Sequence, residues 1–302
     1  KKMLAIVNPP LASINRSLSS ILKSHHLKLI HKFDDLQKYK LQLTKPNKII
    51  IIIMDVFTAV LNDSVLINFC LLLLKFDYIP IVIYPQILGK SFLVSGMLTQ
   101  FLHAANNIKT LLSSFILNDV PIVCLENSMS LLLNNDYKKY GIELFDSNSN
   151  KQHNKIYTIA DIMVQLINSK DDTIQKIALY KQNLSMHHQK IQYVFLPHCS
   201  TKSRYPVEYD NWMMVYNAFG LNAKVLELSC CGMSGTYGHT YENYKNSQQI
   251  YNLSWKPNIQ LDQKNIHYLV TGYSCKSQVS LLDKQILQHP IDHLYNLIEL
   301  NN

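Results

Sequence analysis

Short, almost wholly apolar segments alternate with longer segments of helical spacing along most of the chain. The isoleucine-rich run from Lys48 to Phe57 predicts a strand over 49–54, because an unbroken apolar run of this length is typical of a parallel strand buried on both faces. Further strands are expected in the first half at 79–84 and 120–125, and helices at 65–76, 92–118 and 128–140. This order of strands and helices favours an α/β fold.

The same alternation returns in the second half of the chain. Strands are expected there at 192–196, 223–228 and 267–271, and helices at 212–219, 241–255 and 294–300. Pro257 is expected to stop the middle helix, because proline has no backbone N–H to donate. We therefore predict an internal duplication, with two pseudo-repeated lobes, each a mostly parallel sheet flanked by helices.

A polar stretch without periodicity at 146–154 is the best linker in the chain. Helical material follows it at 156–184 and is expected to bridge the two halves. The predicted organisation is an entry segment at 1–47 with a strand at Leu4–Val7, a first lobe at 48–145, a linker and bridging helix at 146–190, and a second lobe at 191–302.

The formal net charge is +8, but the lysines are scattered and the only arginines are Arg16 and Arg204. A protein that reads a nucleic-acid groove or clamps phosphates uses more arginine, so no nucleic-acid partner is expected. No segment reaches the ~18 consecutive apolar residues of a membrane span, and the first residues lack the pattern of a signal peptide. These features predict a cytoplasmic protein.

The chain has six cysteines, which are too few for a disulfide framework. Cys70 and Cys124 lie in apolar surroundings and are interpreted as buried structural thiols. The remaining cysteines each follow a predicted strand of the second lobe, and they are Cys199, Cys230, Cys231 and Cys275. Carboxyl ends of parallel strands share one edge of a sheet, where ligands bind in α/β folds. We expect the four thiols to meet there as ligands of an iron–sulfur centre or zinc.

The loop after the cysteine doublet concentrates the glycines of a chain that has only eight. Gly232, Gly235 and Gly238 precede His239 directly. Glycine is needed where the backbone adopts positive φ or approaches another group closely, so these four residues are predicted to bind the cofactor. His198, next to Cys199, is a further candidate metal ligand, because histidine replaces thiolates in Rieske centres. A hydrogen-bonded structural histidine is the alternative for His198 and for His239.

The run from Cys230 to His239 resembles the cysteine-rich CCG domain. This domain occurs in the heterodisulfide reductase B subunit, the anaerobic glycerol-3-phosphate dehydrogenase C subunit and bacterial FAD-linked, iron–sulfur D-2-hydroxyacid dehydrogenases of the D-lactate or D-2-hydroxyglutarate type. Supporting segments lie at 197–199, 243–247, 250–251, 254–255, 271–278 and 289–290, and fainter ones at 55–58, 89–90, 96 and 137. The resemblance to the last group covers most of residues 48–300.

Three features depart from the family pattern. The pattern ends in Cys-x-x-Cys, whereas this chain has Gly272 in place of the first thiol, and Thr240 replaces the acid that commonly follows the loop histidine. The first lobe lacks the corresponding cysteines, with Asp55 and residues 126–128 near those positions. The resemblance thus implies one 4Fe–4S-type site, in the C-terminal electron-transfer part of an oxidoreductase that oxidises a D-2-hydroxyacid.

The resemblance also implies partners. They are an upstream FAD-binding domain and a ferredoxin-like domain, on the same polypeptide or a partner subunit, and an external electron acceptor. This chain has no glycine-rich phosphate loop after an early strand, so alone it is expected to bind no FAD and to have no dehydrogenase activity. The expected location is cytoplasmic, or peripheral at the inner face of the membrane. A zinc-stapled module and a metal-free docking module for the flavin domain are the alternatives.

Overall fold

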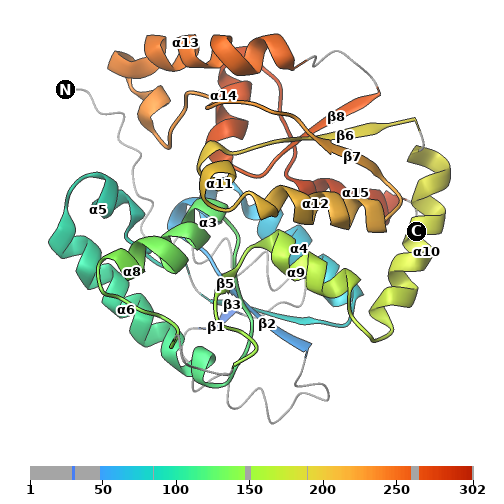
Figure 1. Cartoon of the computed structure of the whole chain (residues 1–302), viewed down its shortest axis with the longest axis horizontal. Coiled ribbons are helices and arrows are strands. Elements are labelled where there is room, and N and C mark those ends of the chain that lie inside the picture. The colour runs from blue at the N-terminus through green and yellow to red at the C-terminus, as the bar shows by residue number, and fades with distance from the viewer. Residues whose placement is uncertain are drawn as a thin grey trace. The chain divides into compact units, whose positions relative to one another are not determined.

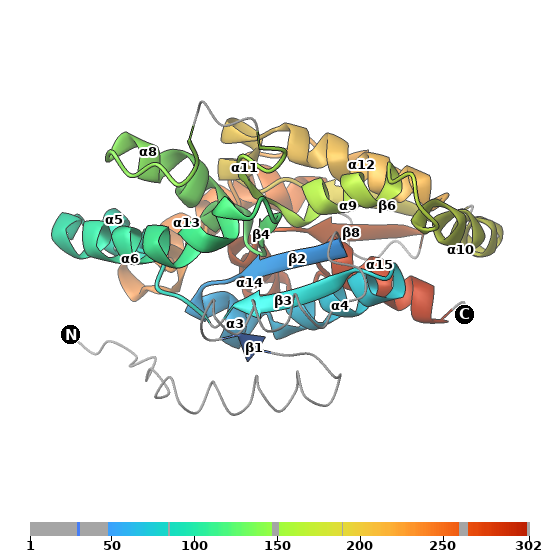
Figure 2. The same cartoon turned by 90° about the horizontal axis from the view of Figure 1, so that it is seen from below.

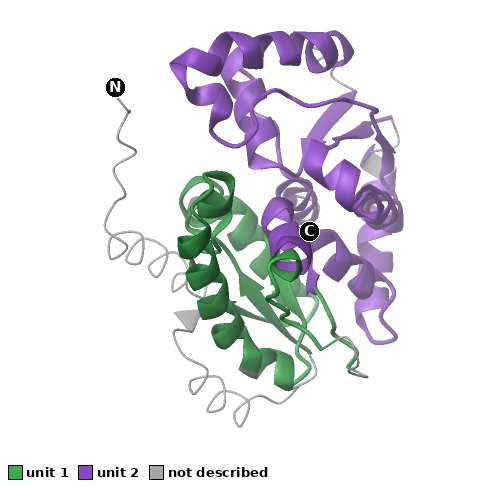
Figure 3. Cartoon of the chain, turned by 60° about the vertical axis from the view of Figure 1, so that its left-hand side comes forward, with its two compact units in different colours: residues 1–125, 137–155 green, residues 126–136, 156–302 purple. Residues whose placement is uncertain are grey.

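The structure is a computed structural model that describes residues 29–30, 48–83, 85–146, 151–188, 190–259 and 265–300. The strand expected at Leu4–Val7 lies outside these residues. The chain divides into two compact units (Figure 3). Unit 1 holds the described residues up to Leu125 together with 137–155, and unit 2 holds 126–136 and the described residues from Ile156 onward. The segment predicted as a linker and bridging helix is therefore shared between the units, and 126–136 leave the predicted first lobe for unit 2.

The sheet of unit 1 explains the apolar runs of the first half. Its strands are β1 (Leu29–Ile30), β2 (Ile49–Ile53), β3 (Ile79–Ile83) and β4 (Ile122–Cys124). They lie side by side in the order β1-β3-β2-β4, and neighbouring strands run parallel (Figure 2). Ile51 at the centre is opposite Ile81 on one side and Ile122 on the other. All five residues of β2 are buried, as expected of a strand covered on both faces.

The helices of unit 1 are α3 (Val56–Leu61), α4 (Asp63–Lys75), α5 (Lys90–Val94), α6 (Leu98–Leu117) and α8 (Tyr137–Lys139). The single helix predicted at 92–118 is wrong: α5 and α6 are separate, and Gly96 between them has φ +73°. Helix α3 was not predicted. Asp55 starts it, because its side chain accepts a hydrogen bond from the Thr58 backbone N–H at 3.0 Å, as an N-cap residue does.

The sheet of unit 2 repeats the strand order of unit 1. Strand β6 (Gln192–Leu196) lies between β7 (Asn222–Val225) and β8 (Ile266–Val270), parallel to both (Figure 1). In each unit the first long strand is central, the next strand pairs with one edge and the third with the other. The predicted α/β fold, with two parallel sheets flanked by helices, is confirmed, and the shared strand order is what a duplication produces.

The remaining elements belong to unit 2. They are α7 (Asn127–Leu131), η2 (Leu132–Asp136), β5 (Ile156–Tyr157), α9 (Ile159–Ile167), α10 (Thr173–His188), α11 (Cys199–Arg204), α12 (Val207–Ala218), η3 (Tyr237–His239), α13 (Tyr241–Asn258), α14 (Tyr273–Asp283) and α15 (Pro290–Leu300). Pro257 does not stop α13 but lies in its last turn. Across the described ranges, none of the helices has both the length and the apolar character that crossing a bilayer requires.

A buried carboxyl group ties the separate segments of unit 2 together. Glu208, on α12, is 1% exposed. It accepts hydrogen bonds from Asn127 Nδ2 at 3.1 Å, from Trp212 Nε1 at 3.0 Å and from Thr158 Oγ1 at 2.5 Å. Segment 126–136 is thereby fixed to α12 by contacts far apart in the sequence. Burial raises the pKa of this carboxyl to about 7, against the opposing effect of its hydrogen bonds.

Candidate metal centre

The four candidate cysteines lie at the carboxyl ends of the three strands of unit 2. Cys199 is the first residue of α11, which follows β6, and Cys275 lies in the first turn of α14, which follows β8. The doublet of Cys230 and Cys231 lies in the loop after β7. Because β7 and β8 both run parallel to β6, these three connections leave the sheet at the same edge.

The structure brings the four thiols into one cluster. Cys199 Sγ lies 3.8 Å from Cys230 Sγ. Cys230 is hydrogen-bonded to Cys231, and Cys231 is hydrogen-bonded to Cys275. Neither Cys199 nor Cys275 is separated from the doublet, so the three loops share a single site.

The cluster is closed on one side and open on the other. Cys231 and Cys275 are 2% and 1% exposed and pack among the apolar side chains of the unit 2 core. Cys199 and Cys230 are only partly buried. A metal or a redox partner would therefore approach from the side of Cys199 and Cys230.

Hydrogen bonding between the thiols distributes their charge unequally. The pKa of Cys230 is lowered because its sulfur accepts hydrogen bonds from Cys199 and Cys231, assisted by the Gly232 backbone N–H at 3.3 Å. The pKa of Cys199 is raised because it donates to Cys230 and is partly buried. The pKa of Cys231 is raised by its hydrogen bonds with Cys230 and Cys275 and by its burial.

The donor set suits a thiophilic metal, although the side chains are not in a coordinating arrangement. Within the ranges that the structure describes, no group of three or more His, Cys, Asp or Glu side chains is positioned to hold a metal ion. Tetrahedral zinc with bonds of about 2.3 Å would place its sulfur ligands about 3.8 Å apart, which is the separation of Cys199 and Cys230. An iron–sulfur cluster is larger and would require these sulfurs to move apart on binding.

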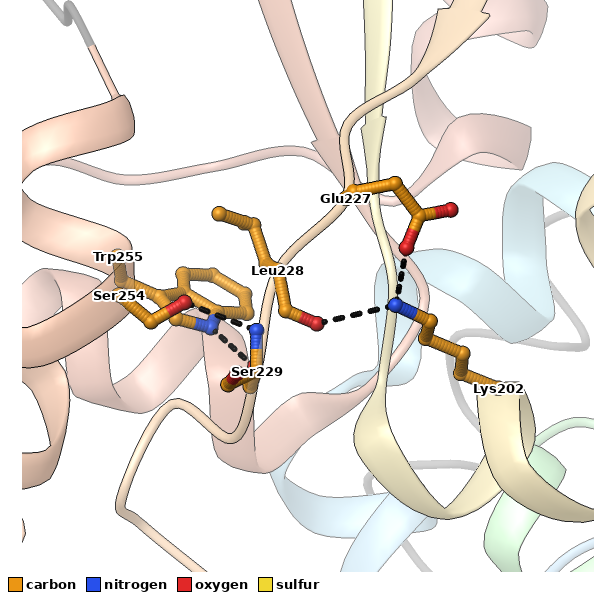
Figure 4. A network of polar contacts seen from close by, with 6 residues as sticks. All are labelled: Lys202, Glu227, Leu228, Ser229, Ser254 and Trp255. Carbon is orange, nitrogen blue, oxygen red and sulfur yellow. Dashed lines mark hydrogen bonds and ion pairs between the residues drawn. The ribbon is translucent and has the colours of Figure 1, made fainter.

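Hydrogen bonds from α11 and α13 fix the backbone that leads into the doublet (Figure 4). The Ser229 N–H donates to Ser254 Oγ at 2.8 Å, and Trp255 Nε1 donates to the Ser229 carbonyl at 2.9 Å. Lys202 Nζ, from α11, donates to the Leu228 carbonyl at 3.5 Å. The two residues before Cys230 are therefore held from both sides, which sets the direction in which the doublet enters the site.

The loop glycines allow the chain to pack closely against α13. Gly232 has φ +89°, and a Cβ there would overlap the Ser247 carbonyl oxygen. A Cβ at Gly238 would lie 2.5 Å from Ser247 Oγ. Gln278 Nε2 donates to the same Ser247 hydroxyl at 2.9 Å, whereas Gly235, with φ +65°, faces open space. Close packing accounts for Gly232 and Gly238, and cofactor binding by the three glycines stays a prediction.

The two candidate histidines differ in position. His239 is exposed on η3, with Nε2 3.0 Å from Ser277 Oγ. His198 is partly buried at the N-terminus of α11, and its backbone N–H donates to Tyr209 Oη at 2.6 Å. The imidazole of His198 is also near enough to Cys230 to contribute to lowering the pKa of that thiol. Of the two side chains, that of His198 is the one that the structure relates to the thiols.

Sequence reasoning missed the residues that support the loops. Ser229, Ser247, Trp255 and Gln278 received no role, although all but Ser229 lie in segments on which the family resemblance rests. Buried polar side chains give no apolar periodicity, so the signal available was their occurrence in those segments. Trp255 donates to the Ser229 carbonyl next to Cys230. Gln278 donates to Ser247, which lies against Gly232 and Gly238 of the cysteine loop.

No protein-family model matches the chain. It is 26% identical over 301 residues to a D-2-hydroxyglutarate dehydrogenase of Haemophilus influenzae, an alignment that covers 99% of this chain and 28% of that protein. It is 26% identical over 250 residues to the D-2-hydroxyglutarate dehydrogenase of Escherichia coli, covering 83% of this chain and 23% of that protein. A shorter match of 79 residues, 34% identical, joins it to the anaerobic glycerol-3-phosphate dehydrogenase C subunit of Escherichia coli and covers 26% of this chain and 19% of that protein.

These similarities confirm the resemblance predicted from the cysteine motifs, and the relatives are oxidoreductases. Over 82% to 99% of its length, this chain is similar in sequence to D-2-hydroxyglutarate dehydrogenases. The chain spans about a quarter of the length of those relatives, with 22% to 28% of each aligned.

Proposed function

We propose that this chain is the electron-transfer part of an FAD-linked dehydrogenase that oxidises a D-2-hydroxyacid. Its iron–sulfur centre would be held by Cys199, Cys230, Cys231 and Cys275. The observation that carries the proposal is the convergence of these thiols from three separate loops, in a chain whose relatives are dehydrogenases. Gathered thiolates are the ligands that iron–sulfur centres use.

The residues of this chain would hold the centre and control its surroundings. When bound, an iron–sulfur cluster supplies one-electron transfer. Cys231 and Cys275 anchor the site in the core and exclude water from that side, while Cys199 and Cys230 face outward. The Gly232 N–H, which donates to Cys230 at 3.3 Å, stabilises negative charge on sulfur, and such hydrogen bonds raise the reduction potential of a thiolate-ligated centre.

The hydroxyacid and FAD would bind outside this chain. About three quarters of each relative lies beyond the region matched here, and the upstream FAD-binding and ferredoxin-like domains, on the same polypeptide or a partner subunit, would fill that role. Reduced flavin would deliver electrons to the thiol-bound centre, and an external acceptor would take them. The proposed location is the cytoplasm or the inner face of the membrane.

A zinc-stapled module is the second candidate, and one observation favours it. The 3.8 Å between Cys199 Sγ and Cys230 Sγ equals the sulfur separation of about 3.8 Å expected around tetrahedral zinc. Zinc has no redox chemistry, so in this case the site would stabilise unit 2 and dock the flavin domain without carrying electrons.

Metal analysis of anaerobically prepared protein tests both candidates. The iron–sulfur proposal predicts iron and acid-labile sulfide, with broad visible absorption, in the wild type. Cys230→Ser should lose both, whereas Cys70→Ala, a fully buried thiol of unit 1, should retain them. Colourless protein with zinc would favour the structural module, and protein without either metal would favour a metal-free docking module. Tight binding of FAD to the chain alone would contradict the assignment of flavin binding to another domain.

A further inference from the structure

Two of the four clustered thiols differ from the other two in their access to solvent. Cys199 Sγ and Cys230 Sγ are 3.8 Å apart, and both side chains are only partly buried. Cys231 and Cys275 are 2% and 1% exposed and lie within the apolar core of unit 2. Cysteine oxidation follows the exposure of the sulfur and is favoured by a second thiol within reach. Within the cluster, these conditions are met together by Cys199 and Cys230.

Polar contacts join the two loops that carry this pair (Figure 4). Lys202 lies one helical turn after Cys199 and forms an ion pair with Glu227. Its Nζ also donates to the Leu228 carbonyl at 3.5 Å. The start of α11 is thereby attached to the segment that leads into Cys230, so the fold itself keeps the two sulfurs close.

The other pairings within the cluster are disfavoured. Cys230 and Cys231 are adjacent in the sequence, and consecutive Cα atoms are about 3.8 Å apart, below the range of about 4.4–6.8 Å that a disulfide normally spans. Cys231 and Cys275 are hydrogen-bonded, but their burial keeps an oxidant from contacting either sulfur. A bond between Cys199 and Cys230 needs only that the sulfurs close to about 2.0 Å.

We propose that Cys199 and Cys230 form a reversible disulfide when the site holds no metal, so that this edge of unit 2 is a dithiol–disulfide centre. The co-reactant is a low-molecular-weight disulfide. The thiolate of one cysteine attacks a sulfur of that disulfide and releases one thiolate. The other cysteine gives its proton to solvent, attacks the mixed disulfide and releases the second thiolate. Two electrons pass from the cysteine pair to the co-reactant, which ends as two thiols.

Peptide mapping of the oxidised wild type identifies the pair. The chain is freed of metal with a chelator, reduced, and incubated anaerobically with oxidised glutathione. The remaining thiols are then alkylated in denaturant before digestion at lysine and arginine. Two of the six thiols should be lost, and the linked product should join peptide 191–202 to peptide 225–245. Fragmentation of that product should place the bond at Cys230, and dithiothreitol should restore all six thiols.

Matched variants separate this pair from general thiol oxidation. Cys199→Ser and Cys230→Ser should each lose the linked product and stop at a mixed disulfide with glutathione on the remaining cysteine. Cys275→Ser removes a buried thiol of the same cluster, and Cys70→Ala removes a fully buried thiol of unit 1. Both of these variants should form the link as fully as wild type. The map of the wild type decides the inference even if a variant fails to fold.

The outcomes separate this inference from the proposed function. If the wild type binds iron and sulfide but loses no thiols to oxidised glutathione once the metal is removed, the iron–sulfur proposal stands and the disulfide is refuted. If the Cys199–Cys230 link forms in a chain that takes up no metal, the disulfide stands and the iron–sulfur proposal falls. A link between peptides 225–245 and 265–276, or one within the doublet, would overturn the inference.

Discussion

Replacing Glu208 by glutamine would isolate the energetic effect of one buried ionisable group. The side chain is 1% exposed, and Oε1 accepts from Asn127 and Trp212 while Oε2 accepts from Thr158. In Glu208→Gln, Oε1 keeps its two donors, and the Thr158 hydroxyl rotates to accept from the new Nε2 group. The variant therefore removes the titration while preserving the shape and the number of hydrogen bonds.

The expected magnitude follows from the pKa of the carboxyl group. Burial raises it from 4.5 to about 7, so the folded protein holds this proton more tightly than the unfolded chain does. The contribution of Glu208 to stability is fully present below pH 4.5 and is lost as pH rises through about 7. The interval from 4.5 to about 7, at about 1.4 kcal/mol per pH unit, corresponds to an upper limit of about 3 kcal/mol.

Urea unfolding of both proteins at pH 4.5 and about pH 8 measures this effect. The two tryptophans, Trp212 and Trp255, both lie in unit 2, so fluorescence follows the unit that contains Glu208. Relative to wild type, Glu208→Gln should gain up to about 3 kcal/mol of unfolding free energy between the acidic and the alkaline condition. Glu242→Gln, at an exposed site on α13, is the matched control and should show no such change. An equal difference between wild type and Glu208→Gln at both pH values would refute the reasoning.

Two further predictions concern a buried histidine and the cysteine loop. Burial lowers the pKa of His293 from 6.5 to about 3, so its contribution to stability is present above pH 6.5 and is lost as pH falls toward 3. In urea unfolding, the fall in unfolding free energy toward about pH 4 should be smaller by a few kcal/mol in His293→Gln than in wild type. An equal fall in both proteins would contradict the prediction. Gly232→Ala combines φ +89° with overlap of the Ser247 carbonyl and should destabilise by about 3 kcal/mol or more. Gly235→Ala, with φ +65° in open space, should lose only about 1 kcal/mol of unfolding free energy. Thermal unfolding of both variants measures the difference, and equal losses would exclude close packing as the reason for glycine at position 232.

The sheets were predictable because their signal is local. The isoleucines of β2 are apolar at every position, as burial on both faces requires. Strand β6 was predicted to the residue, since its apolar run is closed at Pro197. Parallel pairing then determines which edge of the sheet receives the loops, and this rule was sufficient to bring four distant cysteines together.

Helix α14 escaped prediction because of what it buries. Its inward positions are Cys275, Gln278 and Val279, which have helical spacing but include only one ordinary apolar side chain. The glutamine is buried because it donates to Ser247, a residue 31 positions away in the sequence. A helix whose buried face is chosen by such partners has no apolar stripe to detect.

The placement of 126–136 was not predictable for a related reason. Asp136 pairs with Arg204, with Oδ1 2.6 Å from Nη2, and Asn127 donates to Glu208 at 3.1 Å. Arg204, one of the two arginines of the chain, is thus paired with a carboxylate 68 positions away in the sequence. Long-range polar contacts of this kind decide which unit a segment joins, and they leave no trace in periodicity.

Glycines helped to mark the candidate site in the sequence, where they were predicted to bind the cofactor. The structure gives a different physical reason for glycine at two positions of the cysteine loops. Gly232 and Gly272 both lie on cysteine loops, and at each of them a Cβ would overlap a protein group, namely the Ser247 carbonyl and the His198 imidazole. Both glycines therefore shape the loops through contacts within the protein itself. Small domains that fold only on metal binding must order their loops when the metal arrives. Loops that are already fixed by such contacts need little further ordering when a metal binds.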